Sequence, residues 1–183
     1  MEKENNILPI HIDGDPILRT KCEEITKDYP NLKEIIEQMH NTLDSTGTGV
    51  GLAAPQVGLP IRVFILGGKN MERKTFINPV LKFSGELKSG QEGCLSVPKL
   101  YADVERYKRV KVVYYDENFI KQKQSFKKFE AVVIQHEYDH LDGIEFYDKI
   151  SEKDKERLAP EIKKLNNGIL PPLEYKTELY EKN

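Results

Sequence analysis

The sequence predicts an α+β domain in which mostly antiparallel β-sheets pack around one central helix, with a further helix toward the C-terminus. Three observations lead to this fold class. Strand-like runs rich in Val, Tyr and Phe lie between residues 62 and 127. A segment with helical spacing and apolar residues on two sides follows at 129–142. A more polar segment at 151–165 begins with a serine that could cap a helix.

Composition and charge narrow the class of protein. Hydrophobic residues make up 38% and charged residues 32% of the 183-residue chain, as in ordinary globular proteins. We therefore expect a single domain over residues 1–183, with 151–183 as a C-terminal extension. The net charge of −2 shows no excess of basic residues that would indicate nucleic-acid binding. Two cysteines, a charged start and the lack of a long apolar run predict a cytoplasmic protein with no signal peptide and no membrane association.

The first predicted helix spans residues 30–43. Pro30 suits a first helical position, and an apolar stripe at helical spacing contains Leu32, Ile35, Ile36, Met39 and Leu43. The helix should end near residues 44–47, and a glycine-rich loop is expected at 47–58.

Strand signals follow this loop. The predicted strands are 62–66, 76–83, 104–115 and 119–127. Residues 116–118 (Asp-Glu-Asn) are predicted to form a hairpin turn, and a second loop is expected at 90–99.

The segment 129–142 is predicted to be the central helix, and Gly143 is a suitable residue to end it. Ser151 could cap the next helix, which Pro160 should kink or split. The tail at 166–183 is expected to pack loosely or to fray.

The central helix carries an H-E-x-x-H motif, residues 136–140. A spacing of four places the imidazoles of His136 and His140 on one helix face, where both can bind one metal ion. Glu137 beside them can accept a proton from water. The motif could also be a chance match in a helix with two buried histidines. Its position on the most buried helix favours a metal site, because ionisable side chains are rarely buried without partners.

A site of this kind needs a third protein ligand. Metzincins place a histidine where this chain has Phe146, which cannot bind metal. Gluzincins use a glutamate on a later helix, and Glu161 has about the right spacing, but Pro160 is next to it. Cys94 lies in a glycine-containing loop, although a lone cysteine is more often a small buried apolar residue. The residues alone leave this choice open.

Three segments together resemble the peptide deformylase family: 49–56 (GVGLAAPQ), 92–96 (EGCLS) and 135–140 (QHEYDH). Their order and spacing in a chain of this length are highly specific, and all three lie within 47–143. The resemblance extends to residues 15–19 and to Arg106, and it covers about residues 10–150.

The resemblance implies a hydrolase that removes the N-formyl group from the formylmethionine of new polypeptides and releases formate. It implies that Cys94, His136 and His140 bind one divalent metal ion, with water as the fourth ligand. Fe²⁺ is the expected metal, and Zn²⁺, Ni²⁺ and Co²⁺ are the alternatives. Glu137 would be the general base and acid.

The same resemblance assigns two donors to the oxyanion, the side-chain amide of Gln56 and the backbone N–H of Leu95. Formylmethionyl nascent peptides are the expected partners, and the ribosome is a further candidate.

A methionine pocket can be placed by helix geometry. Val132 and Val133 lie on the helix face of the first histidine, and with Val50 they should form an apolar wall beside the metal. For Val133, plain core packing is an equal alternative. The resemblance implies an extended peptide along Val50, Gly51 and Gly93.

Two other functions stay open from the residues. One is a zincin-like metallopeptidase with Glu161 as the third ligand. The other is a metal-binding module without catalysis.

Overall fold

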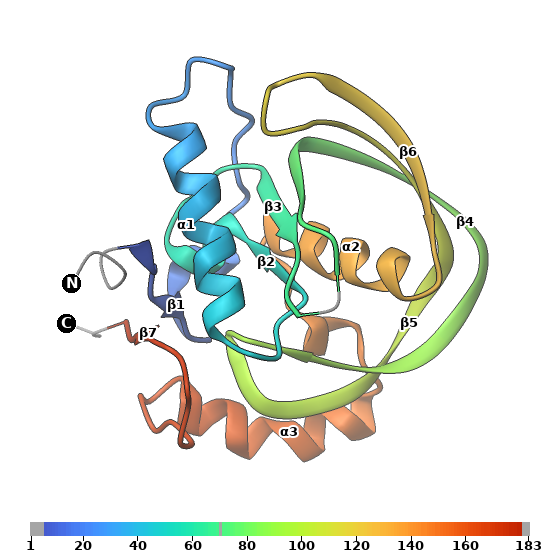
Figure 1. Cartoon of the computed structure of the whole chain (residues 1–183). Coiled ribbons are helices and arrows are strands. Elements are labelled where there is room, and N and C mark those ends of the chain that lie inside the picture. Colours follow the sequence, from blue (N-terminus) through green and yellow to red (C-terminus); the bar gives the residue numbers. More distant parts are fainter. Residues whose placement is uncertain (1–5, 70, 181–183) are drawn as a thin grey trace.

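A computed structural model describes residues 6–69 and 71–180 (Figure 1). The three helices are α1 (Leu32–Ser45), α2 (Lys128–Leu141) and α3 (Glu152–Leu165). The strands are β1 (Ile10–His11), β2 (Gly51–Ala53), β3 (Val63–Leu66), β4 (Lys74–Cys94), β5 (Val97–Tyr115), β6 (Lys121–Lys127) and β7 (Thr177–Glu178). Short 3₁₀ helices are η2 (Pro16–Arg19), η3 (Ala54–Val57) and η4 (Phe146–Lys149). No described helix is long and apolar enough to cross a membrane.

The main sheet has five antiparallel strands in the order β2-β3-β4-β5-β6. β4 and β5 form a long hairpin that curves around α2 (Figure 1). Two of the three register shifts in this hairpin lie between Ile77 and Val80 and between Ser84 and Leu87. Such bulges bend a strand and increase its twist, so they account for part of the curvature. The predicted α+β class and antiparallel sheet are confirmed.

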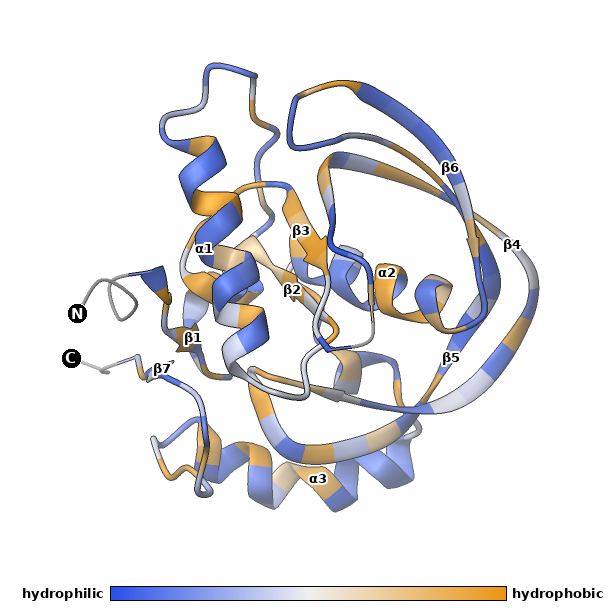
Figure 2. Ribbon diagram, viewed as in Figure 1, coloured by the Kyte–Doolittle hydropathy of each residue, from blue (hydrophilic) through white to orange (hydrophobic). Residues whose placement is uncertain are grey.

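The short strand β3 lies between α1 and α2 and is buried on both faces. Val63 and Ile65 pack with the apolar face of α1, whereas Phe64 and Leu66 pack with α2. This explains its unbroken apolar sequence, because a strand covered on both sides shows no polar alternation. In Figure 2 β3 is hydrophobic throughout, whereas β6 at the sheet edge is mostly hydrophilic.

α2 is the central helix, as expected. Nine of its 14 residues are buried, including both motif histidines. It ends before Gly143, which adopts a positive φ of 70°. Phe129 lies in its first turn and remains 58% exposed. The helix thus brings the H-E-x-x-H motif into the interior of the curved sheet.

The two predicted loops contain regular structure, so both expectations were wrong. Residues 47–58 include β2 and η3. Within 90–99, β4 and β5 run up to a two-residue turn at Leu95 and Ser96. Glycine lowers strand propensity, but here pairing with a neighbouring strand overrides that preference.

The C-terminal region differs from expectation in two ways. α3 continues as one helix through Pro160 instead of being split. The described part of the tail is not loose, because β7 pairs in parallel with β1, with Ile10 opposite Thr177. The backbone N–H of Ile10 donates to Lys176 at 2.9 Å. Main-chain pairing therefore joins the segment around β7 to the segment around β1.

Candidate metal centre and catalytic cleft

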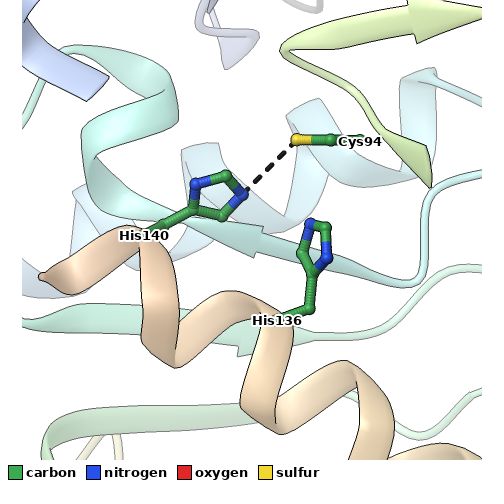
Figure 3. A group of neighbouring side chains, drawn as sticks. All are labelled: Cys94, His136 and His140. Atoms are coloured by element: carbon green, nitrogen blue, oxygen red, sulfur yellow. Dashed lines mark hydrogen bonds between the residues drawn. The ribbon is translucent and has the colours of Figure 1, made fainter. Parts of the chain in front are cut away.

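Cys94, His136 and His140 come together although the cysteine is distant in sequence. Cys94 is the last residue of β4, and the histidines lie one turn apart on α2. One potential ligand atom from each residue lies within 4.8 Å of the others. The Cys94 sulfur is 3.4 Å from Nε2 of His140 (Figure 3). Of the three candidates for the third ligand, Cys94 is the one that the structure places beside the two histidines.

This donor set fits a catalytic metal ion. Two imidazoles and one sulfur leave a fourth tetrahedral position for water or substrate. Burial raises the pKa of the Cys94 thiol in the metal-free protein. A bound divalent cation reverses this effect, because it strongly favours the thiolate.

The ring of His136 is oriented by a buried carboxylate. Its Nδ1 lies 2.9 Å from Glu92, which leaves Nε2 for the metal. Glu92 in turn accepts two hydrogen bonds from Arg106, and Arg106 also pairs with Asp139 of α2. Burial alone would raise the pKa of Glu92, but the hydrogen bonds from His136 and Arg106 hold that pKa at about 2. The carboxylate is therefore ionised at neutral pH.

His140 faces a second buried acid. Its Nδ1 is 3.7 Å from Glu145. Among the described residues, neither this ring nitrogen nor the Glu145 carboxylate has a hydrogen-bond partner. Burial raises the pKa of Glu145 to about 8. Sequence reasoning assigned no role to Glu145 or Glu92, because neither lies at a ligand spacing from the histidines.

Glu137 lies beside the metal ligands and is 4% exposed. Its Oε2 has no hydrogen-bond partner among the described residues. Burial raises the pKa of Glu137 to about 7, although the neighbouring His136 lowers it. The side chain also packs against Gly51, where an added Cβ would lie 2.5 Å from Oε1. Gly51 therefore provides the space that the carboxylate occupies.

Gln56 is placed by η3, and its amide is held in one orientation. Its Oε1 accepts from the backbone N–H of Ala53 at 2.9 Å. This leaves Nε2 facing Cys94 and Ser96, at 3.4 and 3.2 Å. Leu95, the other predicted donor, lies between those two residues in the β4–β5 turn.

The remaining predicted residues line one cleft around the metal ligands: Val50, Gly51, Gly93, Val132 and Val133. Val133 is 6% exposed and also belongs to the core around α2, which confirms the packing alternative, whereas its part in a methionine pocket stays a prediction. Gly93 lies opposite Tyr101, whose ring would be 2.6 Å from an added Cβ. The cleft further includes Phe129, Tyr101 and Tyr175, which sequence reasoning did not select.

Glu161 does not join the cluster. It lies on α3, half exposed, and pairs with Lys164 at 2.7 Å. Phe146, at the metzincin position, is buried with its ring 6.4 Å from that of His136.

The fold and the site indicate a metal-dependent hydrolase of the H-E-x-x-H type, in which a cysteine lies beside the two motif histidines. A sequence model described as polypeptide deformylase matches residues 7–156. A peptide deformylase of Flavobacterium psychrophilum is 44% identical over 193 aligned positions, which cover 96% of this chain and 98% of that protein. The chain belongs to the peptide deformylase family, metal-dependent enzymes that remove the formyl group from the N-terminal methionine of new polypeptides.

Solved structures agree with this assignment. The peptide deformylase of Thermus thermophilus is 36% identical, with a TM-score of 0.82, and the match covers 89% of this chain and 99% of that one. A Plasmodium falciparum peptide deformylase is 35% identical, with a TM-score of 0.82, over 87% of this chain and 95% of that one. The function predicted from the sequence is therefore confirmed.

Proposed function

We propose that Cys94, His136 and His140 hold one Fe²⁺ ion, with Zn²⁺, Ni²⁺ or Co²⁺ able to replace it. The observation that carries this proposal is the convergence of one sulfur and two ring nitrogens within 4.8 Å. Thiolate and imidazole ligands suit these metals and disfavour Mg²⁺ and Ca²⁺. When bound, such an ion polarises the formyl oxygen and acidifies water.

Glu137 is the proton carrier of the reaction. Its carboxylate accepts a proton from the attacking water and then delivers it to the nitrogen of the leaving amine. Burial raises the pKa of this carboxyl in the metal-free protein above that of an exposed glutamate, which favours a group that can both accept and return a proton. The close contact with Gly51 supports this role, since it limits where the carboxylate can move.

Gln56 and Leu95 stabilise the negative charge that collects on the former formyl oxygen. The Gln56 amide is oriented by Ala53, so its N–H groups face the site without further rearrangement. The backbone N–H of Leu95 supplies the second donor. Removal of one such donor typically lowers the rate by about 10²–10³.

The cleft binds formylmethionyl peptides. Val50, Val132 and Val133 provide an apolar wall for the methionine side chain, and Gly51 and Gly93 let the peptide backbone approach. All five residues line the same cleft as Cys94 and His136. We further propose one domain over residues 1–183, a cytoplasmic setting that suits the two free cysteines, and nascent chains at the ribosome as the substrate source.

Formate release tests the proposal directly. The protein is purified without oxygen, loaded with Fe²⁺ or Ni²⁺, and given a formyl-Met peptide beside its acetyl-Met analogue. We expect formate from the first substrate only. Glu137→Ala should keep the metal and lose turnover, which excludes a module without catalysis. Cys94→Ala should lose both, whereas a peptidase that used Glu161 would keep its metal. A folded, metal-loaded protein that releases no formate would contradict the proposal.

A further inference from the structure

The tail after α3 contributes to the catalytic cleft. It leaves α3 and runs to β1, where β7 completes a two-stranded parallel sheet (Figure 1). On the way, Leu173, Glu174 and Tyr175 line the cleft that holds Cys94 and Glu137. The sequence model of the family ends at residue 156, before this segment.

Tyr175 contacts the turn that carries the proposed oxyanion donor. Its hydroxyl donates a hydrogen bond to the carbonyl oxygen of Leu95 at 2.8 Å. Its ring is half-buried and packs with Leu95 at the edge of the α1 core. The Leu95 carbonyl, which Tyr175 binds, and the Leu95 N–H, which is proposed to face the substrate, lie on either side of the Leu95 Cα atom. A restraint on the carbonyl therefore limits how far that N–H can rotate.

The second residue of this turn, Ser96, has contacts of its own. The backbone N–H of Asp13, two residues after β1, donates to the carbonyl of Ser96 at 2.8 Å. Nε2 of Gln56 contacts the Ser96 hydroxyl at 3.2 Å. The sheet formed by β1 and β7 thus anchors both Asp13 and Tyr175 against two consecutive residues of the turn. A turn of two residues has few internal hydrogen bonds, so these external ones define its orientation.

We infer that Tyr175 is a positioning residue for deformylation, whose hydrogen bond aims the Leu95 N–H at the oxyanion. The inference rests on the proposed role of Leu95. Loss of the hydroxyl leaves the donor present but less well oriented. The expected cost is therefore smaller than the loss of a whole donor, on the order of a tenfold decrease in kcat.

Tyr175→Phe removes the hydroxyl and keeps the ring, and Tyr180→Phe is the matched control because Tyr180 lies in the same tail and is 51% exposed. We expect Tyr175→Phe to lower kcat about tenfold, with KM, metal content and melting temperature as in the wild type. The control should leave all four unchanged. A kcat equal to that of the wild type, or a rise in KM alone, would overturn the inference, because the tail would then only line the cleft.

Amide exchange provides a readout that does not depend on turnover. With the metal-loaded protein, hydrogen exchange of the Leu95 amide is followed by NMR in both variants and in the wild type. We expect faster exchange of this amide in Tyr175→Phe and no change in Tyr180→Phe. Unchanged exchange would contradict the inference even if the wild type released formate. Absence of formate from the wild type would instead count against the proposed function.

Discussion

Gly51 occupies a position where no side chain fits. A methyl group there would meet the carboxylate of Glu137 at 2.5 Å, and both Cγ and Cδ of that side chain at 2.8 Å. Real contacts of a Cβ atom are not this short, so the carboxylate would have to move. A displacement of about 1 Å in a catalytic group can cost roughly 10² in rate.

We therefore expect Gly51→Ala to lower kcat by about 10², while metal content stays at the wild-type level. Gly90→Ala is the control, because nothing lies within 4 Å of its added Cβ. Steady-state kinetics separates two causes. Displacement of Glu137 lowers kcat, whereas lost pairing with the peptide backbone raises KM. Equal kcat values in the two variants would show that the carboxylate does not need this space.

At the scale of residues, the proposed ligands and the proposed base could be selected because each lies in a short motif. His136 and His140 follow from helical spacing. Cys94 required the family resemblance, since nothing in the chain links it to residues 42 positions later. Glu145 and Tyr175 could not be predicted, because their contacts arise from tertiary packing and carry no periodic signal.

Two strands and one helix are joined by a single buried ion network. Arg106 on β5 pairs with Glu92 on β4 and with Asp139 on α2, and its side chain is 3% exposed. Removing the cation would leave the buried Glu92 with His136 alone and Asp139 with Lys149 alone. Breaking a buried pair in this way typically costs about 3–5 kcal/mol.

We expect Arg106→Gln to lower the free energy of unfolding by about this amount, measured by urea denaturation. Arg109→Gln on the same strand is the control. Arg109 is exposed and has no ion pair among the described residues, so its loss should change stability by no more than about 0.5 kcal/mol. Similar unfolding energies for both variants would mean that the network contributes little beyond burial.

At the scale of elements, α1, α2, β3 and β6 were predictable from hydrophobic spacing, with ends that differ by a few residues. The long pairing of β4 with β5 was not, because residues 84–92 are polar and glycine-rich and lack an alternating pattern. Their strand conformation depends on cross-strand partners, which a local sequence window does not contain. α3 likewise tolerates Pro160, which local preference alone would place at a helix end.

Metal binding should stabilise the whole molecule. The ligands come from β4 and α2, and an unfolded chain cannot bring them together, so binding favours the folded state. Free metal at a hundredfold excess over Kd adds about 2.7 kcal/mol. For a domain of this size that corresponds to roughly 5–10 °C in melting temperature.

We expect a strong chelator to lower the melting temperature of the wild type by about this amount, measured by calorimetry or by dye-based thermal shift. Cys94→Ala should melt at the same temperature with and without chelator, because it lacks a ligand. An unchanged melting temperature of the wild type after complete metal removal would contradict a stabilising site.

The pairing of β1 with β7 also concerns the order of events during synthesis. Ile10 and Thr177 are partners although 167 positions separate them (177 − 10). Contacts between such distant positions form late, because the chain between them must first be made and folded. Tyr175 can therefore reach Leu95 only after the whole chain between them has been translated. An enzyme that processes growing chains would then complete its own cleft late in its own synthesis.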